Sequence, residues 1–292
     1  MFTGTYTAIV TPFKNGKIDE AALERLVNFQ IDGGVDGVVP VGTTGESPTL
    51  DYEEHIQVIA QTVKFVAGRV KVLAGTGGNS TSEAIYLTQE AEKAGADGSL
   101  QVAPYYNKPT QEGLFQHFHA IARATSLPLM LYSIPGRCGI EIAVDTVERL
   151  AHDSVNIVGI KEAGGVPDRV TQIRRALGSN YSIMCGDDGL TLPFMALGAQ
   201  GVISVASNII PREVSNLVKA MQMDKTAVAL KLHERFHQLF KDLFIETNPM
   251  PIKAALNMLG MMDEELRLPL VPMSVGNRAK LMETLTACGV LK

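Results

Sequence analysis

The residue best placed to do chemistry is Lys161, in the segment NIVGIKEA. The apolar run of Val155, Ile157, Val158 and Ile160 predicts a strand that is covered on both faces, as in a parallel sheet. Lys161 would stand at the carboxyl end of this strand, partly removed from water. Because desolvation disfavours the ammonium form, such a lysine can have a lowered pKa and form a Schiff base with a carbonyl substrate. The alternative is a lysine that only extends from a strand end to the surface.

Four other side chains have the chemistry to assist this amine. Thr43 and Thr44 lie in the glycine-flanked turn GTTGES, where hydroxyl and backbone N–H groups would suit a small carboxylate. Tyr132 ends the apolar segment LMLY, and its phenol could relay protons. Arg137 follows a Pro-Gly pair and could bind a carboxylate in bidentate fashion. Each also has a plainer interpretation, as turn residues, a half-buried aromatic side chain or a solvated loop arginine.

A repeating pattern of strand and helix accounts for the placement of these residues. Predicted strands cover residues 5–10, 36–39, 71–74, 97–102, 129–132, 155–160, 181–184 and 201–205. A predicted helix follows each one, at 19–30, 51–67, 81–93, 112–124, 144–150, 168–177, 190–197 and 212–221. Eight such units predict an α/β fold, a (β/α)8 TIM barrel over residues 1–224, followed by a C-terminal three-helix domain over 225–292. An open doubly wound sheet is the main alternative, and the unit count favours the barrel.

In a barrel of this kind the active site lies at the carboxyl ends of the strands. The turn with Thr43 follows the second predicted strand, Tyr132 and Arg137 belong to the fifth, and Lys161 ends the sixth. The barrel therefore predicts that these side chains meet at one rim.

Composition and charge exclude several classes of function. A net charge of −5 without a basic cluster argues against a nucleic-acid surface. Cys138, Cys185 and Cys288 are odd in number and far apart, which favours reduced thiols over a disulfide framework. The chain has no apolar run of membrane length, and from its first residues, MFTGTYTAIV, we expect no export signal. We therefore expect a soluble cytoplasmic protein with no membrane or nucleic-acid partner.

Two other motifs are weak, and one acidic pair argues against phosphate binding. GTGGNS at residues 75–80 resembles the dinucleotide fingerprint G-x-G-x-x-G, but Ser80 replaces the last glycine. HERFH at 233–237 has the spacing of a zinc site, yet it falls in the C-terminal part, away from the predicted rim, and no third histidine follows. Asp187 and Asp188 come after the seventh strand, where barrels often bind phosphate, and two carboxylates would repel it. We expect no metal site and disfavour sugar-phosphate aldolases.

Four segments, in their order and spacing, resemble the dihydrodipicolinate synthase (4-hydroxy-tetrahydrodipicolinate synthase) family. They are VGTTGES at 41–47, PYYN at 104–107, YSIPGR at 132–137 and GIKEA at 159–163, and the match extends from AIVTPF at 8–13 to NPMPIK at 248–253 and LRLPL at 266–270. GIKEA alone marks the wider group of pyruvate-dependent class I lyases and aldolases. The Thr43-Thr44 pair, Tyr106 and Arg137 together point to the synthases.

The resemblance implies roles for four catalytic residues. Lys161 would form the Schiff base with pyruvate, and Tyr132 would donate and accept protons. Thr43 and Tyr106 would complete a proton relay with Tyr132, with Tyr106 supplied by the neighbouring subunit of a tight dimer. The resemblance also implies a homotetramer of two such dimers, and no metal or organic cofactor.

The resemblance implies four binding residues as well. Thr44 and the backbone at Ile203 would hold the pyruvate carboxylate, with Gly186 lining the pocket. Arg137 would bind the carboxylate of L-aspartate 4-semialdehyde. The enamine would attack the aldehyde and the amine would close the ring, the first committed step of lysine biosynthesis through diaminopimelate.

A lysine feedback site at the dimer interface is a further implication. Matching positions hold Ser47, His55, Asn79, Glu83 and Tyr105. Pro48 and Tyr52 depart from the alanine and histidine expected there, which weakens this prediction. Ser133 and Cys138 also replace the commoner Asn and Thr around Arg137, without removing a catalytic group.

Three alternative functions stay open at this level. A sialic-acid or keto-sugar lyase would keep the Schiff base but would not need the cation of Arg137. A metallopeptidase would use HERFH, and a non-catalytic barrel would serve as a binding module.

Overall fold

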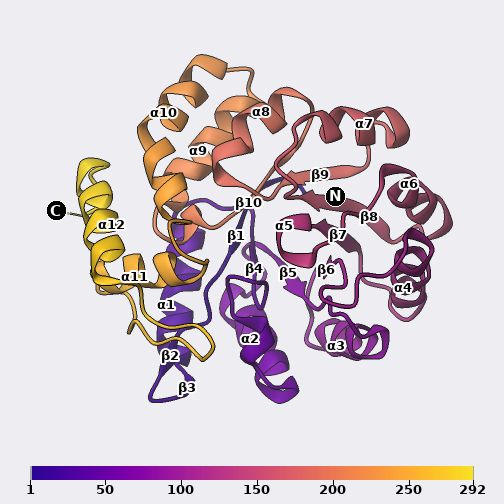
Figure 1. Ribbon diagram of the computed structural model, residues 1–292, viewed down its shortest axis with the longest axis horizontal. Coiled ribbons are helices and arrows are strands. Elements are labelled where there is room, and N and C mark those ends of the chain that lie inside the picture. Colours follow the sequence, from indigo (N-terminus) through magenta and orange to yellow (C-terminus); the bar gives the residue numbers. More distant parts are fainter. Residues whose placement is uncertain (1, 292) are drawn as a thin grey trace.

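A closed barrel of eight parallel strands forms the centre of the computed structural model, which describes residues 2–291 (Figure 1). The strands are β1 (Gly4–Ala8), β4 (Gly37–Val39), β5 (Lys71–Gly75), β6 (Gly98–Val102), β7 (Leu129–Ser133), β8 (Ile157–Glu162), β9 (Ser182–Cys185) and β10 (Gly201–Ser204). Each pairs with the next, and β10 closes the barrel against β1. The predicted fold class is confirmed, and all eight predicted strands are present.

Helices between the strands form the outer ring. They are α1 (Glu20–Asp32), α2 (Tyr52–Val66), α3 (Thr81–Lys93), α4 (Gln111–Arg123), α6 (Val144–Asp153), α7 (Asp168–Leu177), α8 (Thr191–Ala196) and α9 (Pro211–Gln222). Several starts are set by side chains that accept a hydrogen bond from the first turn, and α2 has a full capping box between Asp51 and Glu54. The buried apolar face of each helix packs on the sheet and forms the larger core.

A second, smaller core fills the inside of the barrel. It contains Phe2, Tyr6, Ala8, Val39, Leu73, Leu100, Met130, Tyr132, Met184 and Ile203. These side chains exclude water from the barrel interior. Any polar group that ends a strand on this side therefore stands on an apolar floor.

The connections contain short elements that the sequence pattern did not predict. They are a hairpin of β2 (Phe13–Lys14) and β3 (Lys17–Ile18), the short helix α5 (Pro135–Cys138), and three turns of 3-10 helix, η1 (Ser47–Thr49), η2 (Asp188–Leu190) and η3 (Ala206–Asn208). One prediction was wrong in detail: Val155 lies before β8 and is 92% exposed, so the buried strand begins at Ile157.

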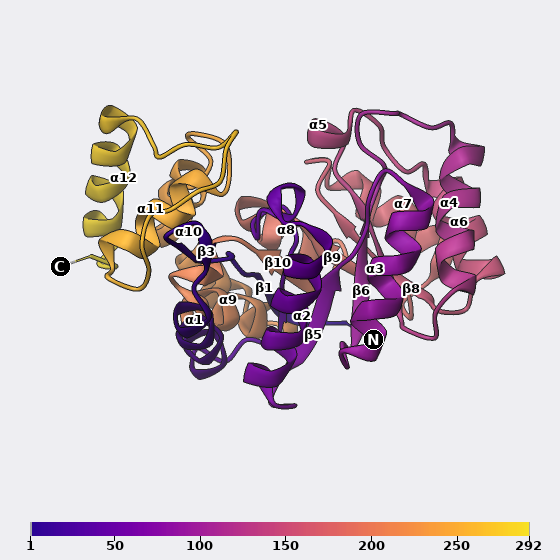
Figure 2. The same ribbon diagram turned by 90° about the horizontal axis from the view of Figure 1, so that it is seen from below.

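Three helices follow the barrel, as the pattern predicted. They are α10 (Thr226–Asp242), α11 (Met250–Met258) and α12 (Val275–Ala287), and Figure 2 shows them gathered on one side of the barrel. α10 packs against α9 and α12, and α11 packs against α12 and η3. The Thr284 hydroxyl donates to the Asp242 carboxylate at 2.7 Å and joins α12 to α10. The division into two domains at residue 224 stays a prediction.

Candidate active site

Lys161 lies in the barrel wall next to Tyr132. The two residues are register partners on β8 and β7, and Lys161 Nζ lies 4.3 Å from the centre of the Tyr132 ring. Lys161 is only 6% exposed, so it is buried more deeply than the sequence predicted, which was a lysine only partly removed from water. The strand therefore delivers the amine to the inside of the barrel and not to the outer surface.

Burial makes the Lys161 amine unusually easy to deprotonate. Desolvation lowers its pKa to about 8, the Arg137 cation adds to this effect, and the Asp188 carboxylate opposes it. With that pKa about a tenth of the amine is neutral at pH 7, compared with well under a thousandth for an ordinary lysine. The residue has the electrostatic environment of an amine nucleophile.

Tyr132 and Thr43 form a hydrogen-bonded pair beside this amine. Burial raises the pKa of Tyr132 above its ordinary value, although Arg137 and the hydrogen bond with Thr43 both lower it. The phenol therefore stays protonated at neutral pH and can give a proton to a departing oxygen. Thr43, Tyr132 and Lys161 lie together in the structure, as predicted.

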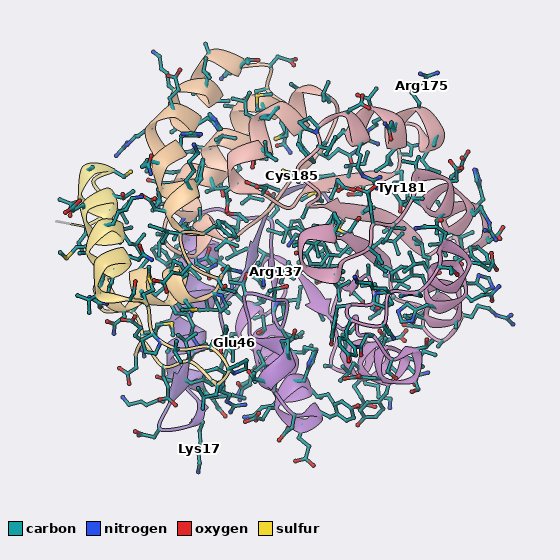
Figure 3. The ribbon with its side chains drawn as sticks, in the orientation of Figure 1. Lys17, Glu46, Arg137, Arg175, Tyr181 and Cys185 are labelled. Atoms are coloured by element: carbon teal, nitrogen blue, oxygen red, sulfur yellow. The ribbon has the colours of Figure 1, made fainter. Side chains whose placement is uncertain are left out.

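Two cavities share lining residues at this end of the barrel, and Lys161 lines the inner one. An inner cavity of about 50 Å³ is lined by Ala8, Val39, Gly42, Thr43, Thr44, Leu100, Tyr132, Ile134, Arg137, Lys161, Gly186, Val205, Phe244 and Asn248. An outer cavity of about 230 Å³ shares Thr43, Tyr132 and Arg137 with it. By the measure of roughly 10–15 Å³ for one water, the inner cavity holds a molecule of a few heavy atoms. Arg137, which lines both cavities, lies near the centre of the helix ring in Figure 3.

The C-terminal part of the chain completes the inner cavity. Asn248 Nδ2 donates to Thr44 Oγ1 at 3.0 Å, and the Asn248 carbonyl oxygen accepts from Arg137 Nη2 at 3.2 Å. Asn248 Oδ1 is buried without a hydrogen-bond partner among the described residues. From the sequence we considered only HERFH in the C-terminal part, away from the rim, and missed that Asn248 and Phe244 line the cavity. The resemblance at NPMPIK was the one signal for Asn248.

The absence of a side chain at Gly186 leaves space for the Lys161 side chain. A Cβ atom at Gly186 would lie 3.0 Å from Lys161 Cε and 2.6 Å from the Ala163 Cβ, closer than side chains normally approach. Ile203 lies on β10 with its side chain in the inner core. It is not among the cavity-lining residues, although Val205 two residues later is. Gly186 is thus at the predicted pocket, and Ile203 lies just below it.

Asp188 has a different role from the one that its position suggested. Its buried carboxylate accepts from Ser204 Oγ at 2.5 Å and from the backbone N–H groups of Val205 and Ala206 at 3.0 and 2.9 Å. The carboxylate therefore fastens the loop after β10 and is not presented to a ligand. The repulsion of a phosphate by Asp187 and Asp188 stays a prediction.

The remaining predicted residues lie around the outer cavity or outside it. Tyr106 is 89% exposed, has a left-handed backbone with φ of 72°, and lines neither cavity.

The proposed feedback residues gather near the outer cavity. Ser47 and Tyr105 line it, Asn79 Nδ2 donates to the Tyr105 carbonyl at 3.2 Å, and His55 Nε2 lies 2.8 Å from the Gly75 carbonyl oxygen. The Glu83 charge raises the pKa of Tyr105, in addition to the larger effect of burial. These contacts bring α2, α3 and the loops after β4, β5 and β6 together.

His233 and His237 lie one turn apart on α10, with ring centres 5.5 Å apart. Within residues 2–291, no group of three or more His, Cys, Asp or Glu side chains is arranged to hold a metal ion. Over the same residues, no helix is long and apolar enough to cross a membrane.

Comparison with known proteins gives a consistent set of relatives. Residues 1–288 match the Dihydrodipicolinate synthetase family. A 4-hydroxy-tetrahydrodipicolinate synthase of Aquifex aeolicus is 52% identical over 285 residues, which are 98% of this chain and 97% of that protein.

Solved structures agree over the whole length. The 4-hydroxy-tetrahydrodipicolinate synthase of Methylacidiphilum fumariolicum SolV has a TM-score of 0.98 and 59% identity, covering 99% of this chain and 96% of the other. A chloride-inhibited dihydrodipicolinate synthase of Acinetobacter baumannii, solved in complex with pyruvate, has a TM-score of 0.97 and 44% identity, covering all of both chains.

The space beside Lys161 can be tested by filling it. We expect Gly186→Ala to displace the Lys161 side chain and to slow reductive trapping of a small keto acid on the protein at least tenfold. The strain of such overpacking is about 1–3 kcal/mol, which leaves the protein folded. Gly276→Ala is the control, because a Cβ atom there meets nothing within 4 Å. Unchanged trapping by Gly186→Ala, measured by mass spectrometry, contradicts the assigned position of the amine.

Proposed function

Because this chain belongs to the dihydrodipicolinate synthetase family, we propose that it binds pyruvate on Lys161 and condenses it with L-aspartate 4-semialdehyde. Its activity is that of a 4-hydroxy-tetrahydrodipicolinate synthase, a lyase of lysine biosynthesis through diaminopimelate. The single observation that carries the assignment of Lys161 is its buried amine, with a pKa of about 8, at the floor of a small cavity beside Tyr132.

The chemistry begins at the amine. The neutral amine of Lys161 attacks the carbonyl carbon of pyruvate, and the carbonyl oxygen leaves as water after it takes up protons. Tyr132 supplies a proton for this departure, and Thr43 passes protons to and from the phenol. Loss of a methyl proton converts the imine to an enamine, whose carbon attacks the aldehyde. The amino group of the second substrate then displaces Lys161 and closes the ring.

Two polar sites orient the substrates. Thr44, whose hydroxyl is held by Asn248, is within the inner cavity and would bind the pyruvate carboxylate together with the backbone near Ile203. Arg137 stands where the inner and outer cavities meet and would bind the carboxylate of the aldehyde. The second substrate would thus occupy the outer cavity with its aldehyde toward the enamine.

The reaction of Lys161 is the first prediction. Borohydride with pyruvate should attach a stable adduct to Lys161, and Lys161→Ala should abolish both the adduct and the synthase activity, because no other lysine among residues 2–291 lines the inner cavity. Lys93→Ala removes an exposed surface lysine and should retain both. Peptide mapping by mass spectrometry locates the adduct, and an adduct on another residue contradicts the mechanism.

Arg137 should affect one substrate and not the other. Because a charge-assisted hydrogen bond contributes about 1.5–3 kcal/mol, we expect Arg137→Ala to raise the KM for aspartate semialdehyde roughly 10- to 100-fold. Trapping of pyruvate should stay within about threefold of the unmodified protein. Arg175→Ala, at the rim of the helix ring in Figure 3, is the matched control. A rise in the KM for pyruvate alone would assign Arg137 to the other carboxylate.

Tyr106 is proposed to act in the neighbouring subunit of a tight dimer. Its side chain is exposed and lines neither cavity of its own chain, so it is free to enter a second copy. We propose that two such dimers form a homotetramer, which sedimentation can measure.

Mixed assemblies test this sharing. Tyr106→Phe and Lys161→Ala should each be nearly inactive, but reassembled mixtures should regain about a quarter of full activity, because half the dimers hold one intact site. The Lys161→Ala/Tyr106→Phe double variant, mixed with Tyr106→Phe, is the control that cannot complement. No gain in the first mixture means that Tyr106 does not act across subunits.

We propose two further properties, one from the resemblance and one from the cysteines. We propose that L-lysine binds at the group of Ser47, His55, Asn79, Glu83 and Tyr105 and inhibits the enzyme, which an assay with added lysine tests directly. We also propose a cytoplasmic location, because Cys138, Cys185 and Cys288 are all free thiols, as in a reducing compartment. Recovery of the protein in a membrane or exported fraction would contradict it.

A further inference from the structure

The turn that carries Thr43 and Thr44 ends at a buried ion pair. Glu46 follows Thr44 by two residues, and its Oε1 lies 2.5 Å from Lys253 Nζ on α11. Both side chains are completely buried. Figure 3 shows Glu46 at the border between the loop that precedes α2 and the C-terminal segment drawn in yellow.

The ion pair has partners on two other segments, residues 11–13 and Arg267. Lys253 Nζ also donates to the Thr11 carbonyl oxygen at 2.9 Å, and Glu46 Oε2 accepts from the Arg267 backbone N–H at 3.1 Å. The Phe13 ring lies below both cations, with Lys253 Nζ 4.3 Å and the Arg267 guanidinium carbon 4.4 Å from its centre. The buried charges of Glu46 and Lys253 therefore both have hydrogen-bond partners within the protein.

The backbone of Glu46 is in a conformation that it would not choose alone. Its φ and ψ of 56° and 36° are left-handed, which is uncommon for a residue other than glycine and persists only where the surroundings enforce it. Inside the turn, Glu46 N donates to the Thr43 carbonyl and Gly45 N donates to the Gly42 carbonyl, both at 3.1 Å. The anchored carboxylate therefore fixes the turn at residues 42–46, and with it the direction of the two threonine side chains.

Lys253 belongs to a C-terminal segment that also contributes to the inner cavity. Lys253 is five residues after Asn248, which holds Thr44 Oγ1 and the Arg137 guanidinium. Thr44, two residues before Glu46, and Asn248, five residues before Lys253, both line the inner cavity. One ion pair joins the barrel wall of the cavity to its C-terminal wall.

A gain in folding stability does not explain why the Glu46–Lys253 ion pair is buried. Removing two charges from water is expensive, and a buried ion pair often contributes no more to folding than an apolar pair of the same size. We propose that Glu46 and Lys253 are positioning residues: their ion pair holds the turn at 42–46 and Asn248 in the geometry that binds the pyruvate carboxylate. The proposal rests on the proposed function, since it assumes that Thr43 and Thr44 face pyruvate.

The test separates positioning from simple stabilisation. The main variant is Glu46→Gln/Lys253→Met, which removes both charges together and leaves neither unpaired. A loosened turn weakens ground-state binding, so we expect the KM for pyruvate to rise at least tenfold while kcat falls less than threefold. A merely structural pair would lower the amount of active enzyme, and so the maximal rate, without changing that KM. That second pattern overturns the proposal.

Single variants and controls complete the design. Glu46→Gln and Lys253→Met should each raise the KM for pyruvate, and the double variant should be less affected than the product of the two, because they remove one interaction. Asp242→Asn is the matched control: it alters another buried, ion-paired carboxylate, one that contacts Lys280 and Thr284 and not the turn. We expect its KM to be unchanged.

Two readouts keep the outcome unambiguous. If the charge-removing variants do not fold, Lys253→Arg decides the matter: it keeps the charge with a larger head group, and we expect a KM for pyruvate raised about threefold, whereas an unchanged KM overturns the proposal. Borohydride trapping on the unmodified protein is run in parallel. Absence of trapping there means that the proposed function has failed, while normal trapping with unaltered KM values in the variants means that only the positioning role has failed.

Discussion

The removal of the Lys161 amine from water is the constraint on which the rest of the site depends. An ammonium group at the inner face of a barrel strand loses hydration that the apolar floor of Met130, Met184 and Leu100 cannot replace. The neutral form becomes accessible, and the amine becomes a nucleophile near neutral pH. The nearby Asp188 carboxylate opposes this shift, but its lone pairs are occupied by Ser204 and two backbone N–H groups. The balance leaves the pKa close to the pH at which the cell works.

A barrel alone does not complete this site. Its strands deliver Lys161, Tyr132 and the turn with Thr43, and these groups could do the proton chemistry of an imine. The cavity has a second wall, which the segment from Phe244 to Asn248 provides. The ion pair of Glu46 with Lys253 joins the two walls through the protein interior, so the binding turn and the C-terminal helices are held as one unit. The amine thus comes from the barrel strands, whereas the cavity beside it is lined by both parts of the chain.

Local pattern in the sequence predicted the parts of the structure that local physics determines. Alternating strand and helix units are a matter of periodicity and turn chemistry, so the eight strands and their helices could be found one at a time. The meeting of Thr43, Tyr132, Arg137 and Lys161 followed from the rule that a barrel collects its strand ends at one rim. Val155 was misplaced because an apolar residue before a strand has the same appearance as one inside it. The roles of Asn248, Glu46 and Asp188 depend on partners that are distant in the chain or turned inward, and periodicity does not indicate which way a loop carboxylate points.

The mechanism depends on a poorly solvated Lys161 amine, and the titration of this amine measures its solvation directly. The lysine ε-carbon and ε-nitrogen signals can be followed by NMR across the alkaline range, with Lys161→Ala identifying the signal of interest. A lowered pKa predicts a midpoint near pH 8, with the amine protonated and unreactive below it and available to pyruvate above it. A midpoint at or above about 10.4, the ordinary value for lysine, would show that the barrel does not desolvate the amine and would contradict the account.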